Sequence, residues 1–214
     1  LFRELAPLKI RWAGLATTKI AWDDELLALA RKSGCRGLLV GFETVSMESL
    51  AESAKKFNTH QSYDLVIRKL HDAGIAIMGT FVFGFDADNP DIFHRVTEFV
   101  VKHKIDLPRY SILTPFPGTP LYRRLASEQR ILTNNWELYD GQHVVYQPAG
   151  MSAEQLRLGV ETAWKNTYSW ANIARRLVGS RRMLLKAMAA NLGYRFYGYN
   201  LDKFYTCGAE IIAA

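Results

Sequence analysis

Strand-like and helix-like segments alternate along the first two thirds of this chain, and that alternation constrains the fold more than any other feature. Apolar or alternating segments typical of strands occur at residues 8–16, 37–42, 75–85 and 109–114. Between them lie segments whose apolar positions recur every three or four residues, as at 60–73. Repeated strand–helix units form parallel sheets with helical crossovers, so the sequence predicts an α/β fold with about four parallel strands.

Several helix starts are marked by residues that cap the free backbone amides of a first turn. We expect Asp23, Asn89 and Thr119 to begin helices, with the residues after each supplying an apolar side. Ser152 is followed three residues later by Gln155, the spacing of a capping box. These signals predict where the crossover helices start.

The chain divides by pattern into a β/α region, residues 1–148, and a mainly helical region, residues 149–214. One long helix is expected to place apolar positions on one face over 156–174. Residues 151–214 carry nine Lys or Arg against four Asp or Glu, so the basic character belongs to this end. The excess suits peripheral contact with an anionic membrane, and a solvated helix face is the alternative.

Other classes of protein lack support in the sequence. No apolar run reaches the length of a membrane-spanning helix, and the first ten residues do not have the pattern of a signal peptide. The two cysteines, Cys35 and Cys207, make no disulfide framework, so a cytoplasmic protein is expected. The five histidines form no pair with the spacing of metal ligands. No zinc-finger or RNP-type motif indicates nucleic acid as a partner.

Ligands of parallel α/β folds lie at the carboxyl ends of the strands, so the residues that follow each strand are candidates for binding. Glu43 and Thr44 follow the apolar strand 37–42. A carboxylate there needs a partner, and an amine or a ribose diol of a ligand is one such partner. A helix cap or a salt bridge is the alternative role.

The next two strands end in further candidates. Gly84 has no Cβ and lets a ligand approach the backbone closely, whereas Asp86 and Asp88 suit either hydrogen bonds to a ligand or a simple turn. Thr114 opens the segment 115–120, in which three prolines fix the backbone as one wall of a site or as an elbow. No residue is singled out as a catalytic acid or base.

Motifs in this order resemble the radical SAM superfamily, in the class whose members usually carry a cobalamin-binding domain. The resemblance covers roughly residues 8 to 165 and is carried by segments 34–44, 56–58, 74–75, 79–88, 113–121, 136–139 and 151–152. It implies a partial TIM-like (β/α) barrel, of which this chain supplies the third to sixth strands. It also implies that Glu43 and Thr44 face the ribose or amino-acid part of S-adenosylmethionine (SAM), with Gly84 and Thr114 near the adenine.

The family's chemistry is reductive cleavage of SAM to a 5′-deoxyadenosyl radical, and in some members methyl transfer through cobalamin. The family's C-x-x-x-C-x-x-C motif, which holds a [4Fe-4S] cluster, does not occur here. We therefore expect a fragment of an enzyme of oxidoreductase or methyltransferase type, acting on a small-molecule or lipid-like substrate, whose N-terminal part is missing and which alone makes no radicals. Two alternatives are a non-catalytic SAM-binding or interaction module and an α/β-barrel enzyme acting on a phosphorylated substrate.

Overall fold

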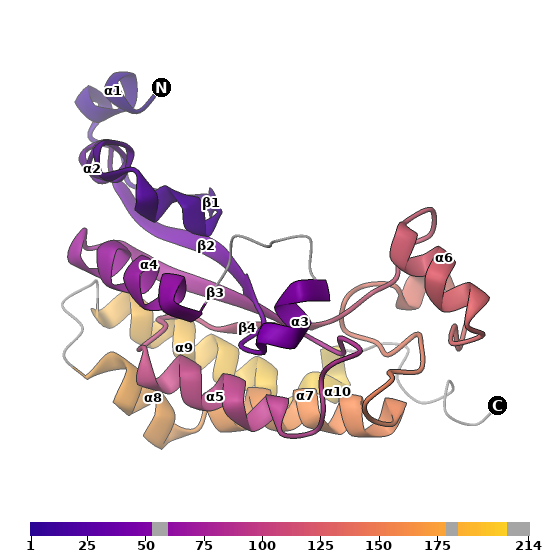
Figure 1. Ribbon diagram of the computed structural model, residues 1–214. Helices are drawn as coiled ribbons and strands as arrows, with labels where there is room; N and C mark the ends of the chain where they lie inside the picture. The colour runs from indigo at the N-terminus through magenta and orange to yellow at the C-terminus, as the bar shows by residue number, and fades with distance from the viewer. Residues whose placement is uncertain (53–59, 179–183, 205–214) are drawn as a thin grey trace.

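The protein is described by a computed structural model over residues 1–52, 60–178 and 184–204. Four parallel strands form one sheet in chain order, and each pairs with the next (Figure 1). They are β1 (Trp12–Ala16), β2 (Cys35–Glu43), β3 (Ala76–Phe83) and β4 (Arg109–Ile112). The predicted α/β fold with four parallel strands is confirmed.

Helices connect the strands and extend beyond the last one. Before β4 lie α1 (Phe2–Leu5), α2 (Asp24–Lys32), α3 (Met47–Glu52), α4 (His60–Asp72) and α5 (Ile92–Lys102). After β4 come α6 (Pro120–Ser127), α7 (Ala153–Thr167), α8 (Trp170–Leu177), α9 (Leu184–Tyr199) and α10 (Leu201–Phe204). Short 3₁₀ turns occupy Ala6–Leu8, Thr18–Trp22 and Trp136–Leu138. Within the described ranges, no helix combines the length and apolarity needed to cross a bilayer.

Three of the four predicted helix starts are confirmed, because a side chain accepts a hydrogen bond from the first turn at each. Asp23 caps α2, Thr119 caps α6, and Ser152 forms a capping box at α7. The prediction for Asn89 is wrong: α5 begins at Ile92. The Asn89 side chain instead accepts a hydrogen bond from the amide of Asp91 at 3.0 Å and shapes the turn before the helix.

The long helix expected over 156–174 is two helices. The first, α7, ends at Thr167, and Ser169 has an extended backbone conformation that breaks the helical path. Its hydroxyl accepts a hydrogen bond from the amide of Asn172 at 3.4 Å and so caps α8. The apolar pattern continues across Ser169 although this serine caps a new helix. Periodicity alone therefore does not reveal the break.

Aromatic residues form the core between the sheet and the helices. Phe42 of β2 stacks on Phe81 of β3, with ring centroids 5.6 Å apart. Tyr63 of α4 and Phe99 of α5 meet Phe42 edge-on, at 5.0 and 6.4 Å. All four are buried, so these rings supply much of the burial that holds the helices on this face.

The helices after β4 pack on the same core. Trp164 of α7 contacts Tyr110 of β4 edge-on at 5.3 Å and stacks on Tyr168. Arg176 of α8, only 1% exposed, donates hydrogen bonds to the carbonyls of Ile105 and Asp106 at the turn before β4. The division into 1–148 and 149–214 stays a prediction, and these contacts join the two parts through a shared core.

The other face of the sheet is left open by the described residues. Figure 1 shows α5, α7, α8 and α9 gathered on one side of the strands, whereas α6 stands beyond their ends. Along β2 and β3 buried residues alternate with half-buried ones, and Leu15 of β1 is 83% exposed. On this open face Leu15, Leu39 and Met78 pair side by side, as do Gly41 and Thr80, and Val82 pairs with Ser111 of β4.

Candidate functional site

The carboxyl ends of β2, β3 and β4 lie along one edge of the sheet. Glu43, the last residue of β2, pairs with Phe81 of β3, and the amide of Leu113 donates to the carbonyl of Phe83 at 2.9 Å. Gly84 and Thr114 follow directly on these two strands. Three of the predicted site residues therefore sit at the same edge, as parallel strands require.

Glu43 has the most unusual backbone of the site. Its φ of 69° lies in the left-handed region, and the pairing of β2 with β3 shifts register between Gly41 and Glu43. A non-glycine residue in that region costs on the order of 1–3 kcal/mol. The residue is half-buried at the end of β2. The fold thus holds a carboxylate in a strained backbone position at the carboxyl end of β2.

Thr44 faces into the protein. It is fully buried, and its hydroxyl oxygen accepts a hydrogen bond from the amide of Ser46 at 3.1 Å. The hydroxyl of Ser46 in turn accepts from the amide of Ser49 at 3.2 Å and donates to Glu48 at 2.7 Å. In this conformation Thr44 shapes the turn into α3, so contact with a ligand stays a prediction for this residue.

Gly84 is required by the protein's own packing. Its φ is 104°, and a Cβ there would clash with the hydroxyl of Tyr146, which donates a hydrogen bond to the Gly84 carbonyl. The Gly84 amide donates to the carboxylate of Asp88 at 2.9 Å. Both polar groups of the Gly84 backbone have protein partners, so the missing side chain makes room for Tyr146 here. Approach of an adenine to this glycine remains a prediction.

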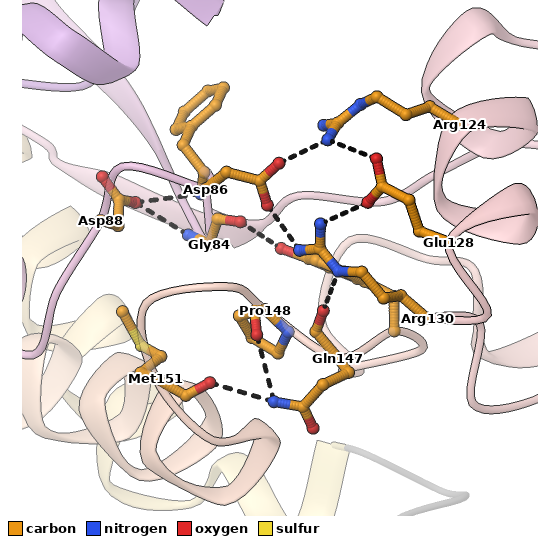
Figure 2. Close-up of polar contacts among 11 residues, drawn as sticks. Gly84, Asp86, Asp88, Arg124, Glu128, Arg130, Gln147, Pro148 and Met151 are labelled. Carbon is orange, nitrogen blue, oxygen red and sulfur yellow. Dashed lines mark hydrogen bonds and ion pairs between the residues drawn. The ribbon is translucent and has the colours of Figure 1, made fainter.

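The two aspartates after β3 hold loops together. Asp88 is buried and accepts from the amides of Gly84 and Phe85 and from the hydroxyl of Ser49, the last at 2.6 Å. Figure 2 shows Asp86 pointing the other way, toward two arginines. The alternative of a structural turn, considered for both residues, accounts for these contacts.

Asp86 bridges the loop after β3 to the segment beyond α6. Arg124 and Arg130 donate to its two oxygens, each at 2.5 Å, and both arginines also reach Glu128 (Figure 2). Burial by itself raises the pKa of the Asp86 carboxyl, but hydrogen bonds from Arg130 and then Arg124 outweigh it and leave that pKa below 3.8. Arg130 also donates to the carbonyl of Gln147 at 2.8 Å. The network fixes the loops that border the site.

Thr114 is half-buried, and its hydroxyl donates to the carbonyl of Ile112 at 3.0 Å. The proline-rich segment that follows leads to Thr119, the cap of α6, so it does act as an elbow before that helix. Phe116 within it is exposed. A ring from this segment is therefore available to contact a flat ligand.

A His–Asp pair near β4 escaped the sequence reasoning. Ring atom Nδ1 of His143 lies 3.0 Å from Oδ2 of Asp140. The intervening Gly141 accepts a hydrogen bond from the amide of Ile112 at 2.7 Å, which holds this loop against β4. The D-x-x-H spacing in the sequence could have indicated the pair. Its position beside β4 depends on the contact between Gly141 and Ile112, which the spacing does not predict.

The chain does not provide a site for an iron–sulfur cluster. It has two cysteines in all. Cys35 is buried at the start of β2, where burial raises the pKa of its thiol, and Cys207 lies outside the described residues. Nowhere in the described ranges do three His, Cys, Asp or Glu side chains come together as metal ligands. A cluster requires more thiolates than this sequence contains.

No protein-family model matches the chain, but curated relatives do. Bacteriochlorophyllide d C-12(1)-methyltransferase of Chlorobaculum tepidum is 32% identical over 179 residues, which are 84% of this chain and 39% of that protein. The anaerobic magnesium-protoporphyrin IX monomethyl ester cyclase of Cereibacter sphaeroides is 25% identical over 89% of this chain and 32% of its own length. The chain thus spans well under half the length of these relatives.

A solved structure has the same fold over part of its length. TsrM from Kitasatospora setae, a radical SAM methyltransferase with cobalamin and a [4Fe-4S] cluster bound, aligns with a TM-score of 0.52 at 21% identity. The alignment covers 59% of this chain and 25% of TsrM. The TsrM alignment bears on the fold, and the relatives include bacteriochlorophyllide methyltransferases. The resemblance to the radical SAM enzymes of the cobalamin-binding class that the motifs indicated is confirmed.

Proposed function

We propose that this chain supplies the SAM-holding part of a radical SAM enzyme of methyltransferase type. The observation that carries the proposal is Glu43, a carboxylate held in left-handed backbone at the end of β2, beside the open face of the sheet. Strained residues at strand ends are characteristic of binding sites. Glycine would adopt this φ without strain, so keeping a glutamate here has a conformational cost.

The residues at this edge fit SAM by their chemistry. A half-buried carboxylate accepts hydrogen bonds from an ammonium group or from ribose hydroxyls. The open face beside it carries Leu39, Gly41, Met78 and Val82, small or apolar residues suited to a flat ring. In the proposal Glu43 binds the polar part of SAM and the open face shields the rest from water.

The radical chemistry itself belongs to groups that this chain does not hold. In such enzymes a [4Fe-4S] cluster supplies the electron that cleaves SAM, and cobalamin, where used, carries a methyl group. Among the described residues, no group of three or more His, Cys, Asp or Glu side chains could hold the cluster. The proposed role of this chain is to bind and orient SAM, with the cluster ligands contributed by other parts of a longer protein.

A second reading is a SAM-binding module without radical chemistry. The cysteine count favours it, because two cysteines are too few to hold a cluster of this kind. Both readings require SAM to bind at the same strand ends. They differ in whether a cluster-bearing segment completes the site.

Binding of SAM to the full chain, measured by isothermal titration calorimetry, tests the shared requirement. Glu43→Gln should weaken binding by about tenfold or more, because a hydrogen bond to a charged group contributes roughly 1.5–3 kcal/mol. Glu161→Gln is the matched control, since Glu161 is also half-buried but lies on α7. The dissociation constant of the Glu161→Gln variant for SAM should equal that of the wild type.

Two results would contradict the proposal. One is a wild-type chain that does not bind SAM. The other is a Glu43→Gln variant that binds as tightly as the wild type. To separate the two readings, the chain should be joined to a segment that carries the C-x-x-x-C-x-x-C motif and the cluster reconstituted: SAM cleavage supports the enzyme, and binding without cleavage supports the module.

A further inference from the structure

Helix α9 presents an apolar stripe to solvent. Leu185, Met188, Leu192 and Phe196 recur at three- and four-residue steps, so they lie along one side of the helix. All four are exposed, Leu185 by 85% and Phe196 by 62%. Its opposite side packs on α7 and α8, where Asn191 is buried and donates to the carbonyl of Asp106 at 3.1 Å. The outward side of α9 is therefore unusually apolar for a helix face that is exposed to water.

Aromatic residues continue the stripe at its C-terminal end. The ring of Phe204 meets that of Phe196 edge-on at 6.2 Å, and both are exposed. Arg195 lies over the rings of Trp170 and Tyr199, at 4.6 and 4.2 Å from their centroids. Exposed Trp and Tyr rings beside an arginine are typical of side chains at the boundary between headgroups and acyl chains.

The helix that carries the stripe has only positive charges. Helix α9 contains no Asp or Glu, and its two charged residues are Lys186 and Arg195. Lys203, just beyond, donates to the side chain of Asn200 at 2.7 Å. Among the side chains that the structure describes, no carboxylate forms an ion pair with any of these three cations.

We propose that α9 docks this protein onto an anionic lipid surface, with the stripe in the headgroup–acyl boundary and the cations on lipid phosphates. An apolar helix face flanked by Lys and Arg binds membranes in this way without crossing them. A two-fold contact with a second copy is disfavoured by charge, because it would bring the two α9 helices together and both carry only positive charges. The proposal does not depend on SAM binding.

Co-sedimentation of the full chain with vesicles at low salt tests the proposal. Vesicles of phosphatidylcholine mixed with phosphatidylglycerol should bind the protein, and pure phosphatidylcholine vesicles should bind it much more weakly. Lys186→Glu combined with Lys203→Glu should lower the partition coefficient at least about 25-fold, since each lost cation contributes about fivefold. Leu192→Asp combined with Phe196→Asp should lower it by at least about tenfold.

Leu132→Asp is the matched control, because Leu132 is 46% exposed and Leu192 is 43% exposed, but Leu132 lies beyond α6. Circular dichroism should show that all variants are folded. The proposal is overturned if the wild type ignores anionic vesicles, or if Leu132→Asp binds as weakly as the α9 variants. It is also overturned if sedimentation velocity finds a dimer that Leu192→Asp converts to monomers, since the stripe would then be a contact between copies.

Discussion

The two faces of the sheet differ in what covers them. On one face Phe42, Phe81 and Tyr110 are buried under α4, α5 and α7. On the other face Leu15 stands exposed and Leu39, Met78 and Val82 are half-buried. Side chains alternate between the two faces along each strand, so each strand contributes residues to both the covered face and the open face.

The difference teaches which residues stabilise the fold and which remain for binding. The covered face supplies the hydrophobic burial on which folding depends. The open face supplies little, and its edge ends in the strained Glu43. Substitutions on the two faces test that separation.

Phe42→Ala should be the most damaging single change to the fold. Removing a buried ring that touches three other rings leaves a cavity, and such changes cost roughly 3–5 kcal/mol of unfolding free energy. Leu39→Ala, on the open side of the same strand, should cost only about 1 kcal/mol. Urea denaturation of both variants measures the contrast. Equal losses would mean that the open face is in fact packed.

High pH should destabilise the covered face through Tyr110. Burial raises the pKa of its hydroxyl from 10.0 to about 12. Because the folded state keeps the proton that the unfolded state loses, stability should fall by about 1.4 kcal/mol per pH unit from pH 10 toward 12. Thermal melts of the wild type and Tyr110→Phe across this range would test it. An identical pH slope in the variant would contradict the assignment.

Low pH should weaken the loop network at the edge of the site. The folded-state pKa of Asp86 lies below 3.8, so its stabilising contribution is present above that pH and is lost as pH falls through the lower value. Asp86→Asn should cost about 1 kcal/mol near neutral pH, as expected for partly exposed ion pairs. The variant and wild type should converge in acid when unfolding is followed by fluorescence. A difference that persisted in strong acid would point to another cause.

Leu15→Ser should have the smallest effect. Leu15 is 83% exposed on the open face, and substitutions at such positions change stability by about 0.5 kcal/mol or less. Differential scanning calorimetry should find nearly equal melting temperatures. A clear loss of stability would show that Leu15 is covered in solution.

Local signals in the sequence predicted much of the fold. The caps at Asp23, Thr119 and Ser152 and the four strands depend on neighbouring residues, and all are confirmed. The cap at Asn89 was wrong because its side chain could serve the turn as well as the helix. Pattern alone cannot choose between two local uses of one side chain.

The details of the candidate site depend on contacts between residues far apart in the chain. Tyr146 reaches Gly84 across 62 positions, and Arg130 reaches Asp86 across 44. No spacing rule predicts such pairs. The sequence therefore located the strand ends, and only the structure distinguishes Glu43 at the open edge from Thr44 inside the protein.

Hydrogen–deuterium exchange of the full chain with and without SAM tests the central claim most directly, that ligand binds where the open face meets the strand ends. The account predicts slower exchange in residues 43–46 and 113–119 when SAM is added, and unchanged exchange in α7, α8 and α9. Protection confined to the helical layer, or none anywhere, would contradict it.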